Sequence, residues 1–237
     1  MNGSLDQPLG EPVPDWAPPP SPQHRELTGR YCRLMPLSFA EHADALYEAY
    51  SADAEGRLWT YLPYGPFADR PAFDAWLQAS AASQGDPLFF TIIDHATQRP
   101  GGVCSYLRIT PAAGSIEIGH LAYAPRLQRT TAATEAMFLL MRHAFELGYR
   151  RYEWKCNALN APSRYAAERL GFQFEGIFRQ AAVVKGRNRD TAWYSIIDQE
   201  WPALHRAFIQ WLSPANFDAD GRQRRSLTAL RDETVAG

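Results

Sequence analysis

The sequence predicts an α/β domain built on one mostly antiparallel sheet. Short β-rich runs alternate with segments of helical periodicity, and glycine- and proline-containing turns separate several of these runs. The chain has 237 residues, of which 46% are hydrophobic, and this is enough for one sizeable core. Because neither an internal repeat nor a second core can be recognised, we expect a single domain.

The first elements in chain order are a strand over residues 31–37 and a helix over residues 38–50. Ser38 followed by Glu41 is a capping box, which predicts the start of this helix. A second helix begins near Asp69. The connection between the two, residues 57–67, is unusually aromatic for a loop and either packs against the domain or lines a pocket.

Residues 88–94 and 103–109 are predicted to form a hairpin, because residues 98–102 contain one proline and two glycines. A third strand follows over 115–123, and helical spacing predicts a helix over 131–147. The remaining expected elements are a strand over 151–156, a helix over 162–170, strands over 172–184 and 193–198 with a turn at 185–188, and a helix over 201–212.

The two ends of the chain differ in composition from the rest. Residues 1–24 are rich in proline, which predicts a disordered or clasping arm. Residues 214–237 mix arginines with acids and have a weak apolar pattern, which predicts a solvated C-terminal tail. The expected domain is therefore residues 25–213.

Charge and cysteine content exclude several classes of protein. Lys plus Arg number 24 against 26 for Asp plus Glu, so a nucleic-acid partner is not expected. No apolar run approaches the roughly 18 residues that cross a bilayer, and a signal peptide is not recognisable, so we expect no membrane partner. Cys32, Cys104 and Cys156 lie far apart without metal-ligand spacing. A reduced, cytoplasmic protein without a metal is the prediction.

Residues 121–136 combine the end of a strand, a loop and the start of a long helix. The free N–H groups and the dipole of a helix N-terminus favour a phosphate, and Arg126 and Arg129 would add positive charge. An ordinary helix start without a ligand is the alternative.

The order of elements over residues 26–212 resembles the GNAT N-acetyltransferase superfamily, in the branch that includes RimJ and RimL. The matching motifs are Glu117-Ile118-Gly119, Gln128 to Glu135, Asn160-Ala161-Pro162-Ser163, Gly171-Phe172, Glu175-Gly176 and Gly186-Arg187-Asn188-Arg189-Asp190. The resemblance implies a GNAT fold, which is a single mixed, mostly antiparallel sheet of about seven strands flanked by helices. It also implies acetyl-CoA as co-substrate and no metal.

By this resemblance, two segments hold acetyl-CoA. The backbone of Leu121, Ala122 and Tyr123 would pair with the pantetheine arm. The pyrophosphate would lie on a loop that comprises Gln128, Arg129, Thr130, Thr131, Ala132 and Ala133. The family loop usually reads Q/R-x-x-G-x-G/A, and Thr131 replaces its first glycine. A positive φ at Thr131 would be sterically costly. Asn160 would bind the pantetheine or, alternatively, close the turn before the next helix.

The resemblance and strand alternation together suggest the catalytic groups. Glu117 would accept the amine proton directly or through water, or else pair with an arginine that braces the sheet. Alternation places Glu117 and His120 on opposite faces unless a bulge intervenes, so we expect one base. The position of the usual GNAT tyrosine is Ala167. In the RimL-like branch that the sequence resembles, a serine three residues after the asparagine serves near the leaving thiolate, and Ser163 occupies this position. The alternative is that Ser163 only helps to start the helix, and Tyr165 is a less well-placed substitute.

By the same resemblance, the acceptor pocket is built from the aromatic loop, residues 59–67, and from a basic hairpin, residues 185–190. The expected substrate contacts are Trp59, Tyr61, Tyr64, Glu117 and Arg187. Plain aromatic packing and a solvated turn are the alternatives. The expected function is an acyltransferase that moves acetyl from acetyl-CoA to a primary amine, of a protein N-terminus or a small molecule, by direct attack in a ternary complex. A non-catalytic CoA-binding or interaction protein is the alternative, and the sequence leaves a homodimer open.

Overall fold

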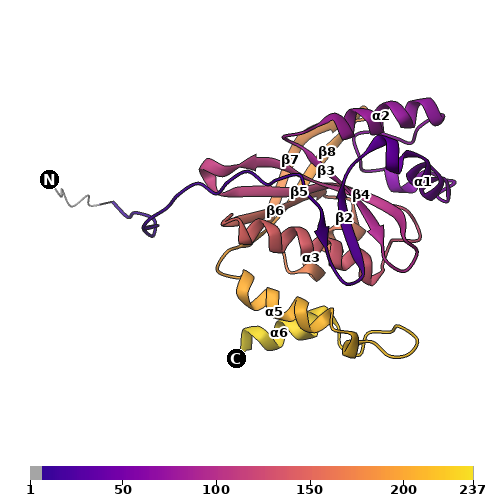
Figure 1. Ribbon diagram of the computed structural model, residues 1–237. Helices are drawn as coiled ribbons and strands as arrows, with labels where there is room; N and C mark the ends of the chain where they lie inside the picture. The colour runs from indigo at the N-terminus through magenta and orange to yellow at the C-terminus, as the bar shows by residue number, and fades with distance from the viewer. Residues whose placement is uncertain (1–6, 237) are drawn as a thin grey trace.

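The computed structural model describes residues 7–236, and eight strands within them form one sheet (Figure 1). The strands are β1 (Leu27–Thr28), β2 (Cys32–Pro36), β3 (Leu88–Asp94), β4 (Arg99–Thr110), β5 (Ser115–Tyr123), β6 (Arg151–Asn157), β7 (Gln173–Val184) and β8 (Arg187–Ile197). Their order is β1-β2-β3-β4-β5-β6-β8-β7, and of the neighbouring pairs only β5 and β6 are parallel. The prediction of one mixed, mostly antiparallel sheet is confirmed, with the two-residue β1 as an additional edge strand.

Six α-helices of the described chain cover the sheet on both faces. They are α1 (Phe39–Ser51), α2 (Arg70–Ala82), α3 (Thr131–Glu146), α4 (Ala161–Leu170), α5 (Trp201–Trp211) and α6 (Leu227–Ala236). In Figure 1, α2 lies above the sheet and α1 to its right, and α3, α5 and α6 lie below it. Neighbouring residues of β3 point to opposite faces: Phe90 packs in the core with α3, and Phe89 packs with α1 and α2. The sheet therefore separates two hydrophobic cores.

The start of α1 uses the predicted cap in a modified form. The Ser38 hydroxyl accepts a hydrogen bond from the Glu41 N–H at 3.3 Å. The reciprocal bond comes from the next residue, because the Ser38 N–H donates to Nδ1 of buried His42 at 3.1 Å. The N–H groups of Ser38 and Glu41 therefore both have acceptors, as in a capping box.

The β3–β4 turn lies earlier than predicted. Residues 95–98 form it, and Pro100, Gly101 and Gly102 belong to β4. The pairing passes from Ile92–Gly102 directly to Ile93–Pro100, so Gly101 is the extra residue of a β-bulge. A proline and two glycines in this segment therefore mark a bulged strand and not the turn.

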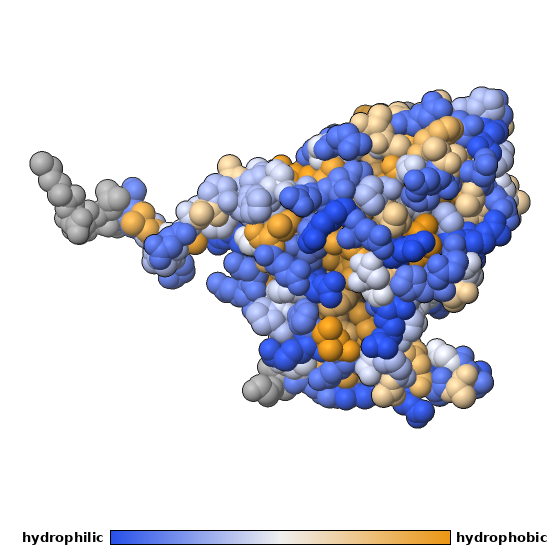
Figure 2. Space-filling model, in the orientation of Figure 1, coloured by the Kyte–Doolittle hydropathy of each residue, from blue (hydrophilic) through white to orange (hydrophobic). Residues whose placement is uncertain are grey.

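The segment after α5 differs from the predicted solvated tail. It folds back as α6, which buries Leu227 and Leu230 against the core. Arg231 of α6 donates to the carbonyls of Glu168 and Arg169 at 2.7 and 3.1 Å, which satisfies acceptors at the end of α4. Figure 2 shows a largely hydrophilic face with apolar side chains gathered above these C-terminal helices.

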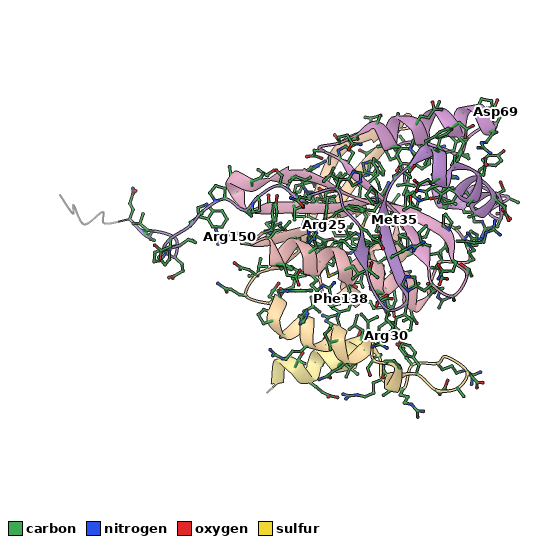
Figure 3. The ribbon with its side chains drawn as sticks, in the orientation of Figure 1. Arg25, Arg30, Met35, Asp69, Phe138 and Arg150 are labelled. Carbon is green, nitrogen blue, oxygen red and sulfur yellow. The ribbon has the colours of Figure 1, made fainter. Side chains whose placement is uncertain are left out.

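The described part of the N-terminal arm contacts the domain. The Arg150 guanidinium lies 5.5 Å from the Trp16 ring centroid, and Figure 3 shows Arg150 beside the arm. Pro19 and Pro22 are buried, and His24 Nε2 lies 2.6 Å from the Phe89 carbonyl oxygen. These contacts agree with a clasping arm for residues 16–24; residues 1–6 of the arm and residue 237 of the tail lie outside the described residues.

Candidate active site

The parallel strands β5 and β6 separate partway along their length. Their pairing ends at Ile118 and Trp154, although β5 continues to Tyr123 and β6 to Asn157. From Gly119 onward, the edge of β5 that faces β6 pairs with no strand of the described chain. A cavity of about 410 Å³ lies at this separation, bounded by β4 to β8, the start of α4 and the loop before α2.

A bulge in β5 brings His120 to this cavity. Gly119 pairs with Ser105 and Ala122 pairs with Val103, so β5 has one more residue than β4 between these pairs. His120 has a φ of 52°, in the left-handed region. Because the bulge changes the alternation of side chains, Glu117 and His120 both line the cavity, and the opposite-face prediction for a regular strand does not apply.

Aromatic neighbours hold the His120 ring. Its Nδ1 lies 3.0 Å from the Tyr64 hydroxyl, and the two rings stack with centroids 5.8 Å apart. The Phe89 ring centroid lies 4.9 Å away. Burial lowers the pKa of His120 below its ordinary value, so the neutral imidazole predominates near neutral pH.

Glu117 lies at the centre of an ionic network in which Glu117 and Lys155 are buried and Arg108 is exposed. Its Oε2 lies 2.8 Å from Nζ of Lys155 and 3.4 Å from Nε of Arg108. Lys155 Nζ also lies 2.6 Å from Glu153 Oε2 and 3.8 Å from the Trp193 ring centroid. Burial raises the pKa of Glu117, and the Lys155 ammonium opposes that rise. Glu117 is thus a buried carboxylate at the cavity wall, held mainly by a lysine that the sequence analysis did not identify.

The start of α4 contributes Asn160 and Ser163 to the same cavity. Asn160 is the helix cap, and its Oδ1 accepts from the Ser163 N–H at 3.2 Å. The Ser163 hydroxyl accepts from Trp154 Nε1 at 3.1 Å. Tyr165 is 69% exposed and does not line the cavity. Burial raises the pKa of the Cys156 thiol, which disfavours the thiolate that a nucleophile would need.

The loop before α3 has the geometry of an anion site, with one difference from the sequence expectation. Arg129, not Thr131, has the positive φ, at 63°. Thr130 caps α3 by accepting the Ala133 N–H at 3.1 Å, and Thr131 and Ala132 begin the helix. The N–H groups of Thr131 and Ala132 have no acceptor within the helix. The steric cost anticipated at Thr131 is therefore absent.

The loop is joined to the end of β5 and lies outside the lining of the cavity. Gln128 Nε2 donates to the Tyr123 carbonyl at 2.8 Å. Leu121 lines the cavity, and Ala122 is fully buried behind it. The open strand edge and the helix N-terminus consequently follow one another along the chain.

Two expected substrate contacts lie away from the cavity. Trp59 is 4% exposed and packs against Tyr50, Phe67 and Trp76, so its ring cannot stack on a ligand. The predicted aromatic-packing alternative is the correct one for this residue. Arg187 is exposed at the end of the β7–β8 hairpin and is not part of the cavity wall.

Other residues of the same two segments do reach the cavity. Tyr61 lines it and donates to the Leu159 carbonyl at 3.2 Å. Tyr64 contacts the site through His120. Arg189, two residues after Arg187 and hence on the same side of β8, lines the cavity wall.

Residues 7–236 contain no group of three or more His, Cys, Asp or Glu side chains placed to hold a metal ion. No helix in this range is long and apolar enough to cross a bilayer.

Comparison with known proteins identifies the chain as an acyltransferase. The chain belongs to the GNAT acetyltransferase domain family, which matches residues 33–173. It is 50% identical to a GCN5-related N-acetyltransferase from Brucella melitensis, over 93% of this chain and 100% of that one, with a TM-score of 0.90. It is 29% identical to the uncharacterized N-acetyltransferase p20 of Bacillus licheniformis, over 68% of this chain and 90% of p20.

The predicted resemblance to the GNAT superfamily is confirmed by these matches. Ribosomal-protein acetyltransferases also share the fold. RimL, a ribosomal alpha-N-protein acetyltransferase, aligns with a TM-score of 0.63 at 21% identity, over 73% of this chain and 94% of RimL.

Proposed function

We propose that this enzyme transfers acetyl from acetyl-CoA to a primary amine by direct attack within a ternary complex. The amine belongs to a small molecule or to a protein N-terminus, the group on which RimL acts by its name. The main support for this proposal is that the part of β5 that pairs with no strand borders the cavity. GNAT enzymes in general use acetyl-CoA as co-substrate.

The residues of the two expected CoA segments fit this ligand. The edge of β5 at Leu121, Ala122 and Tyr123 pairs with no strand of the described chain, so an extended pantetheine arm can pair with it once the Gln128 side chain leaves the Tyr123 carbonyl. The N–H groups of Thr131 and Ala132 supply donors for the pyrophosphate. The Oδ1 of Asn160 accepts the capping bond from the Ser163 N–H. The amide NH₂ group of Asn160 is therefore the part proposed to contact the same arm.

The proposed chemistry uses groups at the cavity wall. Glu117 accepts a proton from the attacking amine, directly or through water, while Lys155 stabilises its carboxylate form. The amine nitrogen bonds to the acetyl carbon, and the carbon–sulfur bond breaks. Ser163 lies at the opposite side of the strand separation and donates toward the departing sulfur.

Turnover tests this function directly. Thiol release from acetyl-CoA is measured with a panel of small amines and N-terminal peptides, and the acetylated product is identified by mass spectrometry. The proposal predicts acceptor-dependent thiol release. A chain that binds CoA but acetylates none of the amines would be a CoA-binding protein.

Replacing Ala133 by Glu is expected to weaken acetyl-CoA binding by at least about tenfold, because a carboxylate at the helix start repels a pyrophosphate. Thr130 caps this helix, so Glu at position 133 occupies the third helical position of a capping box. Ala133 is buried in the core, so circular dichroism first establishes that the variant is folded. Calorimetric titration with CoA measures the affinity. Ala133→Gln has nearly the same shape without the charge and serves as the control; equal affinity of the two variants would contradict this placement of the pyrophosphate.

Ser163→Ala is expected to lower turnover about tenfold, or ~1.4 kcal/mol, because thiolate is already a fairly stable leaving group. Tyr165→Phe should change turnover less, since the Tyr165 side chain is exposed outside the cavity. Both variants are compared at saturating acetyl-CoA. A slower Tyr165→Phe enzyme, or no effect of either substitution, would remove Ser163 from the proposed mechanism.

A further inference from the structure

Positive charge predominates among the arginine, lysine, histidine and acidic side chains that line the cavity. They are Arg108, Glu117, His120, Lys155 and Arg189. Burial keeps the His120 ring neutral near pH 7 by lowering its pKa. The wall therefore presents three cationic side chains and one carboxylate, which disfavours a polycationic acceptor.

Two of the three cations already have carboxylate partners. Lys155 lies 2.8 Å from Glu117 and 2.6 Å from Glu153. Arg108 Nε lies 3.4 Å from the same Glu117 oxygen. Arg189, in contrast, forms no ion pair with any side chain between residues 7 and 236.

The Arg189 guanidinium is half-buried but has few protein partners. Its side chain makes one hydrogen bond within the described chain, from Nη1 to Thr191 Oγ1 at 3.2 Å. Burial lowers the pKa of Arg189, and the Glu117 carboxylate is near enough to oppose that shift. A guanidinium has five N–H donors in a planar fork. Arg189 thus carries a desolvated charge with several donors still available at the cavity wall.

Strand geometry places Arg189 on the face that holds the proposed base. Trp193 of β8 pairs with Lys155 of β6, and alternate residues put Thr191 and Arg189 on the same side. Glu117 pairs with Glu153 and Glu153 pairs with Ser195, so the backbone of Arg189 lies six residues, or roughly 20 Å along the strand, from the register of Glu117. A ligand that reaches both Glu117 and Arg189 must therefore carry its two recognised groups several bonds apart.

We propose that Arg189 binds an anionic group, a carboxylate or a phosphate, on the same acceptor molecule that presents the amine to Glu117. This inference rests on the proposed acetyl transfer and specifies its substrate class as an anionic amine, such as an ω-amino acid or an N-terminal peptide with an acidic residue. The planar guanidinium matches a carboxylate or phosphate in a two-point contact that a neutral amine lacks.

Matched acceptor pairs test the substrate class. The small acceptors are ω-amino acids of increasing length, and each is compared with its carboxamide and with the corresponding aminoalkyl phosphonate. The peptide acceptor has an acidic second residue and is compared with the same peptide in which that residue is the amide. In the native enzyme, kcat/KM for the best anionic acceptor should exceed that for its carboxamide about 10- to 100-fold. The phosphonate and peptide arms identify which anion and which source of it is preferred.

The variants Arg189→Gln and Arg179→Gln test the residue. Arg189→Gln should raise KM for the anionic acceptor about 10- to 100-fold and leave KM for the carboxamide nearly unchanged. Arg179 is exposed on β7 outside the cavity, so Arg179→Gln is the matched control. Arg189→Lys, which keeps the charge without the fork, should restore part of the difference.

Three results would overturn the inference. The first is an equal kcat/KM for an anionic acceptor and its carboxamide, and the second is an equal effect of the Arg189 and Arg179 substitutions. The third is an Arg189→Gln enzyme in which only the KM for acetyl-CoA changes, which would assign Arg189 to a phosphate of CoA. Calorimetric binding of the same acceptors to the CoA-saturated protein separates this inference from the proposed activity. If the anionic acceptor binds in an Arg189-dependent way but is not acetylated, the anion site is supported and acetyl transfer is rejected. If the anionic acceptor and its carboxamide bind with equal affinity, the anion site is rejected.

Discussion

Glu117→Gln is expected to lower kcat about 100-fold, or ~2.7 kcal/mol, because an amide cannot accept the amine proton. Glutamine keeps the size of the side chain and retains an oxygen near Lys155, so acetyl-CoA affinity should be nearly unchanged. The native rate should fall as the pH falls through the pKa of Glu117, which burial raises above 4.5. The variant should lose this acidic limb, which a pH profile of kcat/KM measures.

His120→Gln distinguishes the two proton acceptors of the cavity. Glutamine can still accept from the Tyr64 hydroxyl but cannot serve as a base near neutral pH. If Glu117 is the base, the His120→Gln enzyme keeps the acidic limb of the pH profile and loses less activity than the Glu117→Gln enzyme. A folded Glu117→Gln enzyme with native rate and profile, together with a His120→Gln enzyme that lacks the limb, would assign the proton transfer to His120.

Glu135→Ala is expected to destabilise the fold by about 3 kcal/mol, because this carboxylate anchors the β1–β2 turn to α3. Its oxygens accept the N–H groups of Arg30, Tyr31 and Cys32 at 2.8, 2.5 and 2.9 Å. Glu135 is 4% exposed, and alanine would leave these donors without their charged acceptor. Figure 3 shows Arg30 at this turn, near the C-terminal helices.

Urea denaturation of matched variants measures the effect. Glu146→Ala removes a carboxylate from the exposed end of the same helix, where Glu146 pairs with Arg142 at 3.7 Å, and should change stability by less than about 0.5 kcal/mol. Glu135→Gln keeps one oxygen acceptor and should fall between the two. Similar stabilities of Glu135→Ala and Glu146→Ala would show that the three hydrogen bonds contribute little.

Close packing at this turn also explains one glycine. A Cβ on Gly29 would lie 2.4 Å from a Glu135 carboxylate oxygen, so a larger residue there would displace the carboxylate from its donors. The β1–β2 turn and the start of α3 are thus built as one unit, far apart in sequence.

The sequence by itself determined the elements whose signals are local. The apolar spacing of α3, the cap at Ser38 and the end of α4 at residue 170 were predicted because each depends on residues within one or two helical turns. The alternation of hairpins and helices also determined the fold class. The GNAT motifs then led to the strand edge and loop proposed for acetyl-CoA.

The tertiary structure decided which side chains meet in the cavity. The bulge that brings His120 beside Glu117 is one extra residue in a pairing that the local pattern of β5 cannot show. The contact between Glu117 and Lys155 depends on the register of parallel strands joined by a long crossover.

The same limit applies to Arg189 and to the C-terminal segment. Arg187 and Arg189 lie on one side of β8, and their distances from the hairpin end decide which one reaches the cavity. Residues of α6 have a weak helical pattern, and only the exposed carbonyls of α4 and the apolar surface beside α5 make that segment a packed helix. Local propensity specifies elements, whereas register and long-range packing specify the site, because those energies arise only when distant segments are already in contact.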